Sequence, residues 1–155
     1  ETYVTVGEAI NDLVGKENEI PNHVPMKHNP TVTERIKYIK EGEGIPKDGL
    51  PSDIAYGSRS DYAKNELKNF SHVYRRLSRF KPATTMVPGH NAFPLHPIEN
   101  RSLTVREAAR IQTFPDDVVF CGTRQNQCIQ VGNAVPKVGL SVSQTYRKYP
   151  KRRIS

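Results

Sequence analysis

Twelve prolines and ten glycines interrupt this 155-residue chain, and they are concentrated in a few stretches. Proline removes a backbone donor and breaks helices, so the proline-rich stretches 16–30 and 82–97 are expected to form an extended connector and short strands with turns. Residues 41–60 hold four glycines and two prolines and are expected to be mostly loop. Only 35% of the residues are hydrophobic. The sequence therefore predicts short elements around a thin core.

Three capping boxes mark where helices begin. In this motif a Thr side chain accepts from the amide three residues on, and the Glu there reaches back to the Thr amide. The boxes are Thr5–Glu8, Thr31–Glu34 and Thr104–Glu107, and they predict helices to about residues 14, 40 and 113. We also expect a short helix near residues 62–70, a strand at 72–77, and a last helix from Pro136 to about residue 148.

Positive charge is concentrated in two places. The net charge is +7, and neither residues 71–81 nor residues 147–153 contain an acidic residue. Such clusters fit a polyanionic partner such as nucleic acid. Charge alone is equally compatible with a solvated surface and a basic chain end.

Two late segments resemble a known family. Residues 101–116 (RSLTVREAARIQTFPD) are similar to the ninth conserved motif of the DNA (cytosine-5)-methyltransferases, and residues 130–136 (QVGNAVP) are similar to the tenth. Residues 76–86 (RLSRFKPATTM) resemble the stretch that closes the family's target-recognition region. Phe120-Cys121-Gly122, His96-Pro97 and the opening residues 4–13 also fit. The clear resemblance covers about residues 73–140.

Several hallmarks of that family do not occur in this sequence. Its nucleophile is a cysteine in a Pro-Cys-Gln context, supported by Glu-Asn-Val and Gln-x-Arg-x-Arg motifs, and a Phe-x-Gly-x-Gly loop takes the cofactor. None of these is present. The resemblance therefore implies a C-terminal part, either a fragment or one half of a split enzyme, which has no catalytic residue of its own and is inert alone.

The resemblance implies an α+β fold with two kinds of segment. Residues 16–125 would form a small, loop-rich target-recognition domain with short strands. Residues 1–15 and 126–155 would belong to a Rossmann-like α/β methyltransferase domain that is mostly supplied elsewhere, with a basic tail at the end. The expected partners are double-stranded DNA and the missing catalytic portion, and the cofactor is S-adenosylmethionine.

The resemblance also assigns roles to individual residues. Asn133 and Ala134 would line the cofactor pocket, although Asn133 could equally be a turn residue in a left-handed conformation beside Gly132. The expected DNA-contacting residues are Thr84, Thr85, Arg75, Arg76, Arg79 and Lys81, with Thr85 beside an extruded base and the cations on phosphates. A structural role is expected for Arg101, Thr104, Glu107, Arg110, Phe114 and Pro115.

The remaining alternatives concern reactivity, class and location. Cys121 and Cys128 are expected to be ordinary free thiols, and the scattered histidines do not have the close spacing of a metal site. A non-enzymatic DNA-binding module derived from the family and a protein-interaction domain remain open. No apolar run approaches the roughly 20 residues of a membrane span, so we expect no membrane partner. The resemblance implies a cytoplasmic, bacterial protein that is nucleoid-associated when bound to DNA.

Overall fold

The computed structural model describes residues 3–46, 50–54, 74–86 and 93–134. Its helices are α1 (Val6–Ile10), followed by the 3₁₀ turn η1 (Asn11–Leu13), then α2 (Pro30–Lys37), α4 (Val105–Ile111) and α5 (Arg124–Gly132). The helices predicted at residues 62–70 and 136–148, and the basic tail, lie outside the described residues. In the described part, no helix has both the length and the apolar character that a membrane crossing needs.

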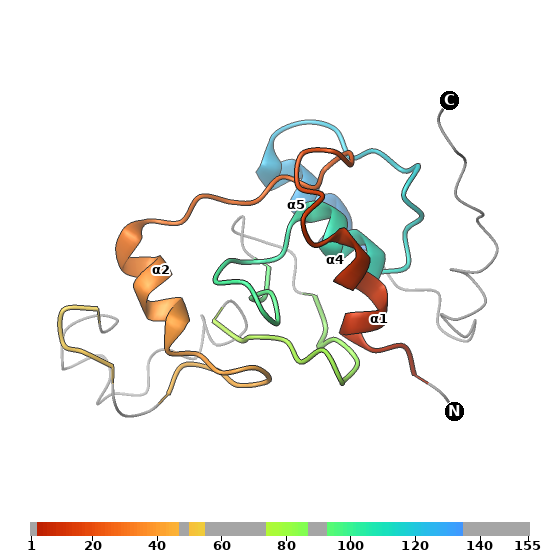
Figure 1. Cartoon of the computed structure of the whole chain (residues 1–155). Coiled ribbons are helices and arrows are strands. Elements are labelled where there is room, and N and C mark those ends of the chain that lie inside the picture. Colours follow the sequence, from red (N-terminus) through yellow and green to blue (C-terminus); the bar gives the residue numbers. More distant parts are fainter. Residues whose placement is uncertain (1–2, 47–49, 55–73, 87–92, 135–155) are drawn as a thin grey trace.

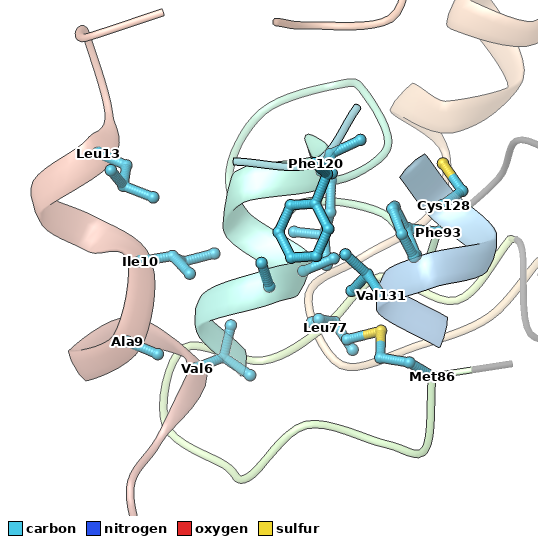
Figure 2. Close-up of a cluster of buried hydrophobic side chains, with 14 residues drawn as sticks. Val6, Ala9, Ile10, Leu13, Leu77, Met86, Phe93, Phe120, Cys128 and Val131 are labelled. Atoms are coloured by element: carbon cyan, nitrogen blue, oxygen red, sulfur yellow. The ribbon is translucent and has the colours of Figure 1, made fainter. Parts of the chain in front are cut away.

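Three of the helices share one core. Helices α1 and α5 both pack against α4, whereas α2 lies apart from this group (Figure 1). Figure 2 shows the side chains that meet there, with Ile10 and Leu13 on one side and Cys128 and Val131 on the other. The cluster also takes Leu77 from the middle of the chain. The cluster therefore contains residues from all three predicted segments, 1–15, 16–125 and 126–155. The boundaries between these segments stay predictions.

The capping boxes were correct at two of the three predicted positions. Both reciprocal hydrogen bonds are present at Thr5–Glu8 and at Thr104–Glu107. The box predicted at Thr31–Glu34 is wrong, because Asn29 caps α2 and Pro30 occupies its first turn. Proline suits that position, since its missing amide would have no partner there. Helix α2 therefore begins and ends earlier than expected.

A second, smaller core lies beneath α2. It consists of Ile36, Ile39, Tyr74 and Leu95. Among the described residues, strand-like pairing is limited to two isolated bridges, Arg76 with Leu95 and Leu95 with Ser102. The short strand predicted at residues 72–77 is thus represented by one bridge at Arg76, and residues 72 and 73 lie outside the described part.

The segment predicted as an extended connector is partly folded into turns. Asn18 and Asn22 adopt left-handed backbone angles, with φ of 67° and 65°. The Asn22 side chain accepts from the Phe120 amide at 2.9 Å and donates to the Phe120 carbonyl at 2.8 Å. These bonds hold residues 16–23 against Phe120, in the loop that follows α4. A single asparagine side chain can do this because it can both accept from the N–H and donate to the carbonyl of one backbone residue.

Helix α4 ends two residues earlier than predicted, in a tight turn. The Phe114 amide donates to Ala109 and the Thr113 amide to Arg110, which is the bonding pattern of a Schellman cap. That cap needs a left-handed residue, and Thr113 has φ of 68°. The turn directs Phe114 against Phe120, whose ring it meets edge-on at 5.1 Å. A β-branched residue at this angle is strained.

Candidate nucleic-acid interface

The basic segment 74–86 is held by backbone hydrogen bonds to other segments, at Glu43 and at Leu95. The Leu77 amide donates to Leu95, the Leu95 amide to Arg75, and the Arg76 amide to Glu43. Leu77 and Met86 are buried in the main core. These anchors fix the direction of the segment, in which Tyr74 and Arg76 are also buried while residues 75, 80–82, 84 and 85 are exposed.

Four of the predicted DNA-contacting residues lie on the exposed side of this segment. They are Arg75, Lys81, Thr84 and Thr85, all exposed. We call residues 75 and 78–85 the basic strip. Thr84 and Thr85 directly precede the buried Met86, so the backbone that bears their side chains is anchored in the core. The strip thus combines cations with hydroxyl groups, which is what contact with a phosphodiester backbone requires.

Arg76 is not part of the strip, which corrects the expectation that it contacts DNA. Its side chain is 4% exposed. The guanidinium donates to the carbonyls of Ile36 and Ile39 at 2.9 and 2.7 Å, and to three groups in the turn 96–100. All of its donors are therefore used inside the protein, and it ties α2 to that turn.

Arg79 is on the strip but has an intramolecular partner. Its guanidinium meets both carboxylate oxygens of Glu41 at 3.2 Å, and its backbone amide donates to the same group at 2.7 Å. These hydrogen bonds lower the pKa of Glu41. A phosphate would have to compete with Glu41 for this guanidinium, so Arg79 is a weaker candidate than Arg75 or Lys81.

The residues expected to be structural form a buried network at the start of α4. Arg101 and Glu107 make a bidentate ion pair with both N–O distances at 2.8 Å. Burial alone would raise the pKa of Glu107, but the hydrogen bonds and charge of Arg101 outweigh it and the pKa is lowered. Glu107 also accepts from the Thr104 amide at 2.7 Å. The Glu107 carboxylate thus completes the N-cap of α4 and also neutralises the charge of Arg101.

Arg110 does not pair with Glu107, although the two residues are three positions apart on α4, because Glu107 pairs with Arg101 instead. Arg110 contacts Asp116 at 2.6 Å and Asp12 of η1. Burial alone would lower its pKa, yet the two carboxylates raise it. Asp116 also lies 3.9 Å from Arg106, so one acid stands between the two like charges of α4.

Two buried histidines extend the network. His96 is part of the His96-Pro97 pair that fits the family resemblance, whereas no sequence pattern singled out His23. His23 Nδ1 lies 2.8 Å from the Thr104 hydroxyl, and its Nε2 lies 3.0 Å from the Leu13 carbonyl. This places it between η1 and the N-cap of α4. His96 Nδ1 accepts from the amides of Ile98 and Glu99. The proton of a neutral His96 is therefore on Nε2, 3.8 Å from Glu107.

Phe114 and Pro115 follow the end of α4. Phe114 is partly buried against the main core. The Pro115 carbonyl accepts from Arg106 at 3.1 Å. Arg106 also donates to Pro21 and Val118, and so joins the loop before α2 to the loop that follows α4. Its burial was not predicted, because its partners are backbone carbonyls that a charge pattern does not reveal.

The expected cofactor residues follow α5, a helix that the sequence did not predict. Asn133 is the C-cap of α5 and is right-handed, with φ of −78°, so the left-handed turn considered for it is wrong. Its side chain is exposed, and Ala134 beside it is half-buried. The Asn133 amide and the Ala134 amide already donate to carbonyls of α5. The carboxamide of Asn133 is thus the group at this position that can meet a polar ligand.

Neither cysteine has the surroundings of an activated nucleophile. Burial raises the pKa of the Cys128 thiol, which disfavours the thiolate. Cys121 is exposed, and both thiols are free. Within the described ranges, no group of three His, Cys, Asp or Glu side chains has the geometry to hold a metal ion.

Comparison with known proteins agrees with the motifs. The family model of the C-5 cytosine-specific DNA methylases matches residues 1–143. The type II methyltransferase M1.HphI of Haemophilus parahaemolyticus is 36% identical over 141 residues, which cover 86% of this chain but 34% of the relative. M.NgoFVII of Neisseria gonorrhoeae is 34% identical over 143 residues, with 89% and 34% covered.

A third relative is covered much more fully. The type II methyltransferase M.AquIB of a Picosynechococcus species is 37% identical over 133 residues, which cover 78% of this chain and 82% of the relative. The chain thus spans about a third of M1.HphI and M.NgoFVII but most of M.AquIB. From its motifs and these matches, the chain belongs to the C-5 cytosine-specific DNA methylase family.

Proposed function

We propose that this chain is the C-terminal part of a DNA cytosine-5 methyltransferase of the restriction-modification type. In this proposal it holds double-stranded DNA and completes the pocket for S-adenosylmethionine, while the catalytic cysteine lies outside these 155 residues, either in the rest of the same polypeptide or in a separate subunit. The observation that carries the proposal is the anchored basic strip, on a chain whose family modifies DNA. The lack of a Pro-Cys-Gln motif in the sequence supports the proposal that the catalytic cysteine lies outside this chain.

The strip would grip DNA through two kinds of group. Arg75 and Lys81 would neutralise phosphates, which releases counterions and makes binding depend on salt. Chemistry on a stacked base requires that its nucleotide leave the duplex. Thr85 would contact the backbone of that nucleotide, since its hydroxyl is exposed while the neighbouring Met86 anchors it in the core.

The cofactor would meet this chain at the end of α5. The exposed carboxamide of Asn133 can both donate and accept, and the neighbouring Ala134 adds a small apolar surface. These groups fit one wall of a polar ligand's pocket. When bound, S-adenosylmethionine supplies the methyl group that is transferred to C5 of cytosine.

A short chain of this family is compatible with a split enzyme. M.AquIB is named a type II methyltransferase, and this chain covers 82% of its length. A stand-alone DNA-binding module is the competing proposal, because the basic strip would serve either function.

A reconstitution experiment separates the two. The 155-residue chain, the polypeptide that carries the Pro-Cys-Gln motif in the same gene or a neighbouring reading frame, and their mixture are each incubated with duplex DNA and methyl-labelled S-adenosylmethionine. We expect label in DNA from the mixture and none from this chain alone. Salt-dependent DNA binding without restored methyl transfer would favour the stand-alone module instead, and labelling by the chain alone would overturn the proposal that the catalytic cysteine lies outside it.

The cofactor contact has its own test in the reconstituted enzyme. Asn133→Leu should weaken S-adenosylmethionine binding, measured by calorimetry, and leave DNA affinity unchanged. Gln125→Leu is the matched control, because Gln125 is exposed at the opposite end of α5. Equal cofactor affinity in the Asn133 variant and the unaltered enzyme would remove Asn133 from the site.

A further inference from the structure

Residues 78–81 of the basic strip form a turn that is fixed to α1. Within it, the Lys81 amide donates to the Ser78 carbonyl and the Phe80 amide to the Ser78 hydroxyl. From α1, the amides of Val6 and Gly7 donate to the Lys81 and Arg79 carbonyls, both at 3.0 Å. A Cβ on Gly7 would lie 2.9 Å from the Arg79 carbonyl, so this approach requires glycine. The turn 78–81 is therefore a defined platform.

This platform presents an aromatic ring to solvent. Phe80 is 76% exposed, more than any other large hydrophobic side chain in the described part of the chain. The Arg79 guanidinium lies 5.2 Å from the ring centroid and is itself held by Glu41. The ring thus has a cation beside it and is otherwise open. Its exposure is a property of the anchored turn.

The surroundings of Phe80 distinguish it from two other exposed apolar residues, Ile98 and Val119. Isolated exposed apolar side chains are common and need no explanation. Ile98 and Val119 are exposed too, but Ile98 precedes Glu99, and Val119 follows Asp116 and Asp117. Phe80 instead stands between Arg79 and Lys81. A partner that suits both features is anionic and also offers flat apolar surfaces.

Nucleic acid has both features. Aromatic side chains stack on base faces, while neighbouring cations take the phosphates. In an intact duplex the faces are covered, but they are uncovered where a nucleotide leaves the stack or where an apolar side chain wedges into a base step. We propose that Phe80 packs on a base face of the bound DNA next to the nucleotide that is extruded. This inference rests on the proposed DNA-binding function and adds a residue that the basic pattern does not contain.

A tryptophan reporter tests the contact directly. The chain has no tryptophan, so Phe80→Trp introduces a single indole at the tip of the turn. The variant chain is titrated with an intact duplex and with the same duplex carrying one mismatched pair, whose bases unstack more easily. We expect quenching of the added emission, stronger with the mismatched duplex. Tyr38→Trp is the control, since Tyr38 is exposed at the end of α2, and its emission should change little.

Removal of the ring should have a different signature from removal of a charge. Phe80→Ala should weaken DNA binding by about 5- to 150-fold, the range expected for one base–aromatic stack. Its salt dependence should be unchanged, because a phenyl ring releases no counterions. Lys81→Ala should instead lower the slope of log affinity against log salt by about one.

The outcomes separate this inference from the proposed function. If the unaltered chain binds duplex DNA but Phe80→Trp is not quenched and Phe80→Ala binds normally, the inference is wrong and the function stands. If the unaltered chain shows no salt-dependent binding, both are wrong. If the indole emission shifts on addition of the Pro-Cys-Gln polypeptide without DNA and not on addition of DNA, Phe80 belongs to a protein interface and the inference is overturned.

Discussion

The segments 74–81 and 101–110 each carry three arginines, and the structure uses them in different ways. In 101–110 all three are buried and bonded to carboxylates or carbonyls. In 74–81 Arg76 is buried in the same manner, whereas Arg75 faces solvent and Arg79 is half-exposed beside Glu41. An arginine thus becomes structural where carbonyls and acids converge on it, and it is available to a ligand where they do not.

The largest effect that would sharpen this comparison is on stability. Arg106→Ala should lower the free energy of unfolding by at least about 3 kcal/mol, because the carbonyls of Pro21, Pro115 and Val118 lose their charged donor. Urea denaturation followed by circular dichroism measures it. A loss below about 1 kcal/mol would show that these bonds are replaced by water at little cost.

The adjacent pair Arg75 and Arg76 tests the comparison within one segment. Arg76→Ala should cost about 2–4 kcal/mol of stability, since it leaves the carbonyls of α2 and of the turn 96–100 without their donor. Arg75→Ala should stay within about 0.5 kcal/mol and lower the salt slope of DNA binding by about one. If the two variants behave alike in both assays, the division between buried and exposed arginines fails.

The buried network should also make stability depend on pH. Burial lowers the pKa of His96 below its ordinary value near 6.5, and Arg101 and Arg76 act in the same direction, against Glu107 and Glu99. Below pH 6.5 the unfolded chain therefore binds more protons at His96 than the folded chain does, so stability falls as the pH decreases through that region.

The variant His96→Asn isolates this contribution, because its side-chain oxygen can still accept from the amides of Ile98 and Glu99. Urea denaturation between pH 7.5 and 5.5 should show a shallower loss of stability in the variant. The loss should not vanish, since burial also lowers the pKa of His28. An identical pH profile in both proteins would argue against a titrating His96.

The smallest expected effect is a gain in the free energy of unfolding. Thr113→Gly should raise the free energy of unfolding by about 0.5–1 kcal/mol, because glycine adopts the left-handed angle at the end of α4 without strain. Gly15→Ala is the converse control: its φ is 80° and no atom within 4 Å would contact the new Cβ, so a loss of about 1 kcal/mol would be purely conformational. Thermal unfolding resolves both, and a destabilised Thr113→Gly would contradict the strain.

The parts of the fold that follow from neighbouring residues could be predicted. The boxes at Thr5–Glu8 and Thr104–Glu107 are confirmed because each depends on four consecutive residues. Helix α5 was missed because Thr123 caps it without a glutamate at the third position. Local pattern likewise placed α2 wrongly, since Asn29 and Pro30 together outcompete the box at Thr31.

The candidate site likewise contains residues that could be predicted from the sequence and residues that could not. The exposed Thr84, Thr85 and Lys81 were found from the sequence, and their role in DNA binding stays a prediction. The burial of Arg76 was not foreseen, because its acceptors Ile36, Ile39 and His96 lie 20 to 40 residues away in the chain. Phe80 was overlooked because a charge pattern does not count aromatic residues. Its exposure depends on the approach of the turn to Gly7, which connects residues some 70 positions apart.

The anchoring of the basic strip has a consequence for protein engineering. Arg76, Leu77 and Met86 face inward and hold the backbone, while Arg75, Lys81, Thr84 and Thr85 are exposed and contribute nothing to the core. These four side chains can therefore be exchanged without loss of core packing. Exchanging them for the corresponding side chains of a relative, with the three anchors retained, is a way to redesign DNA contacts without redesigning the protein that carries them.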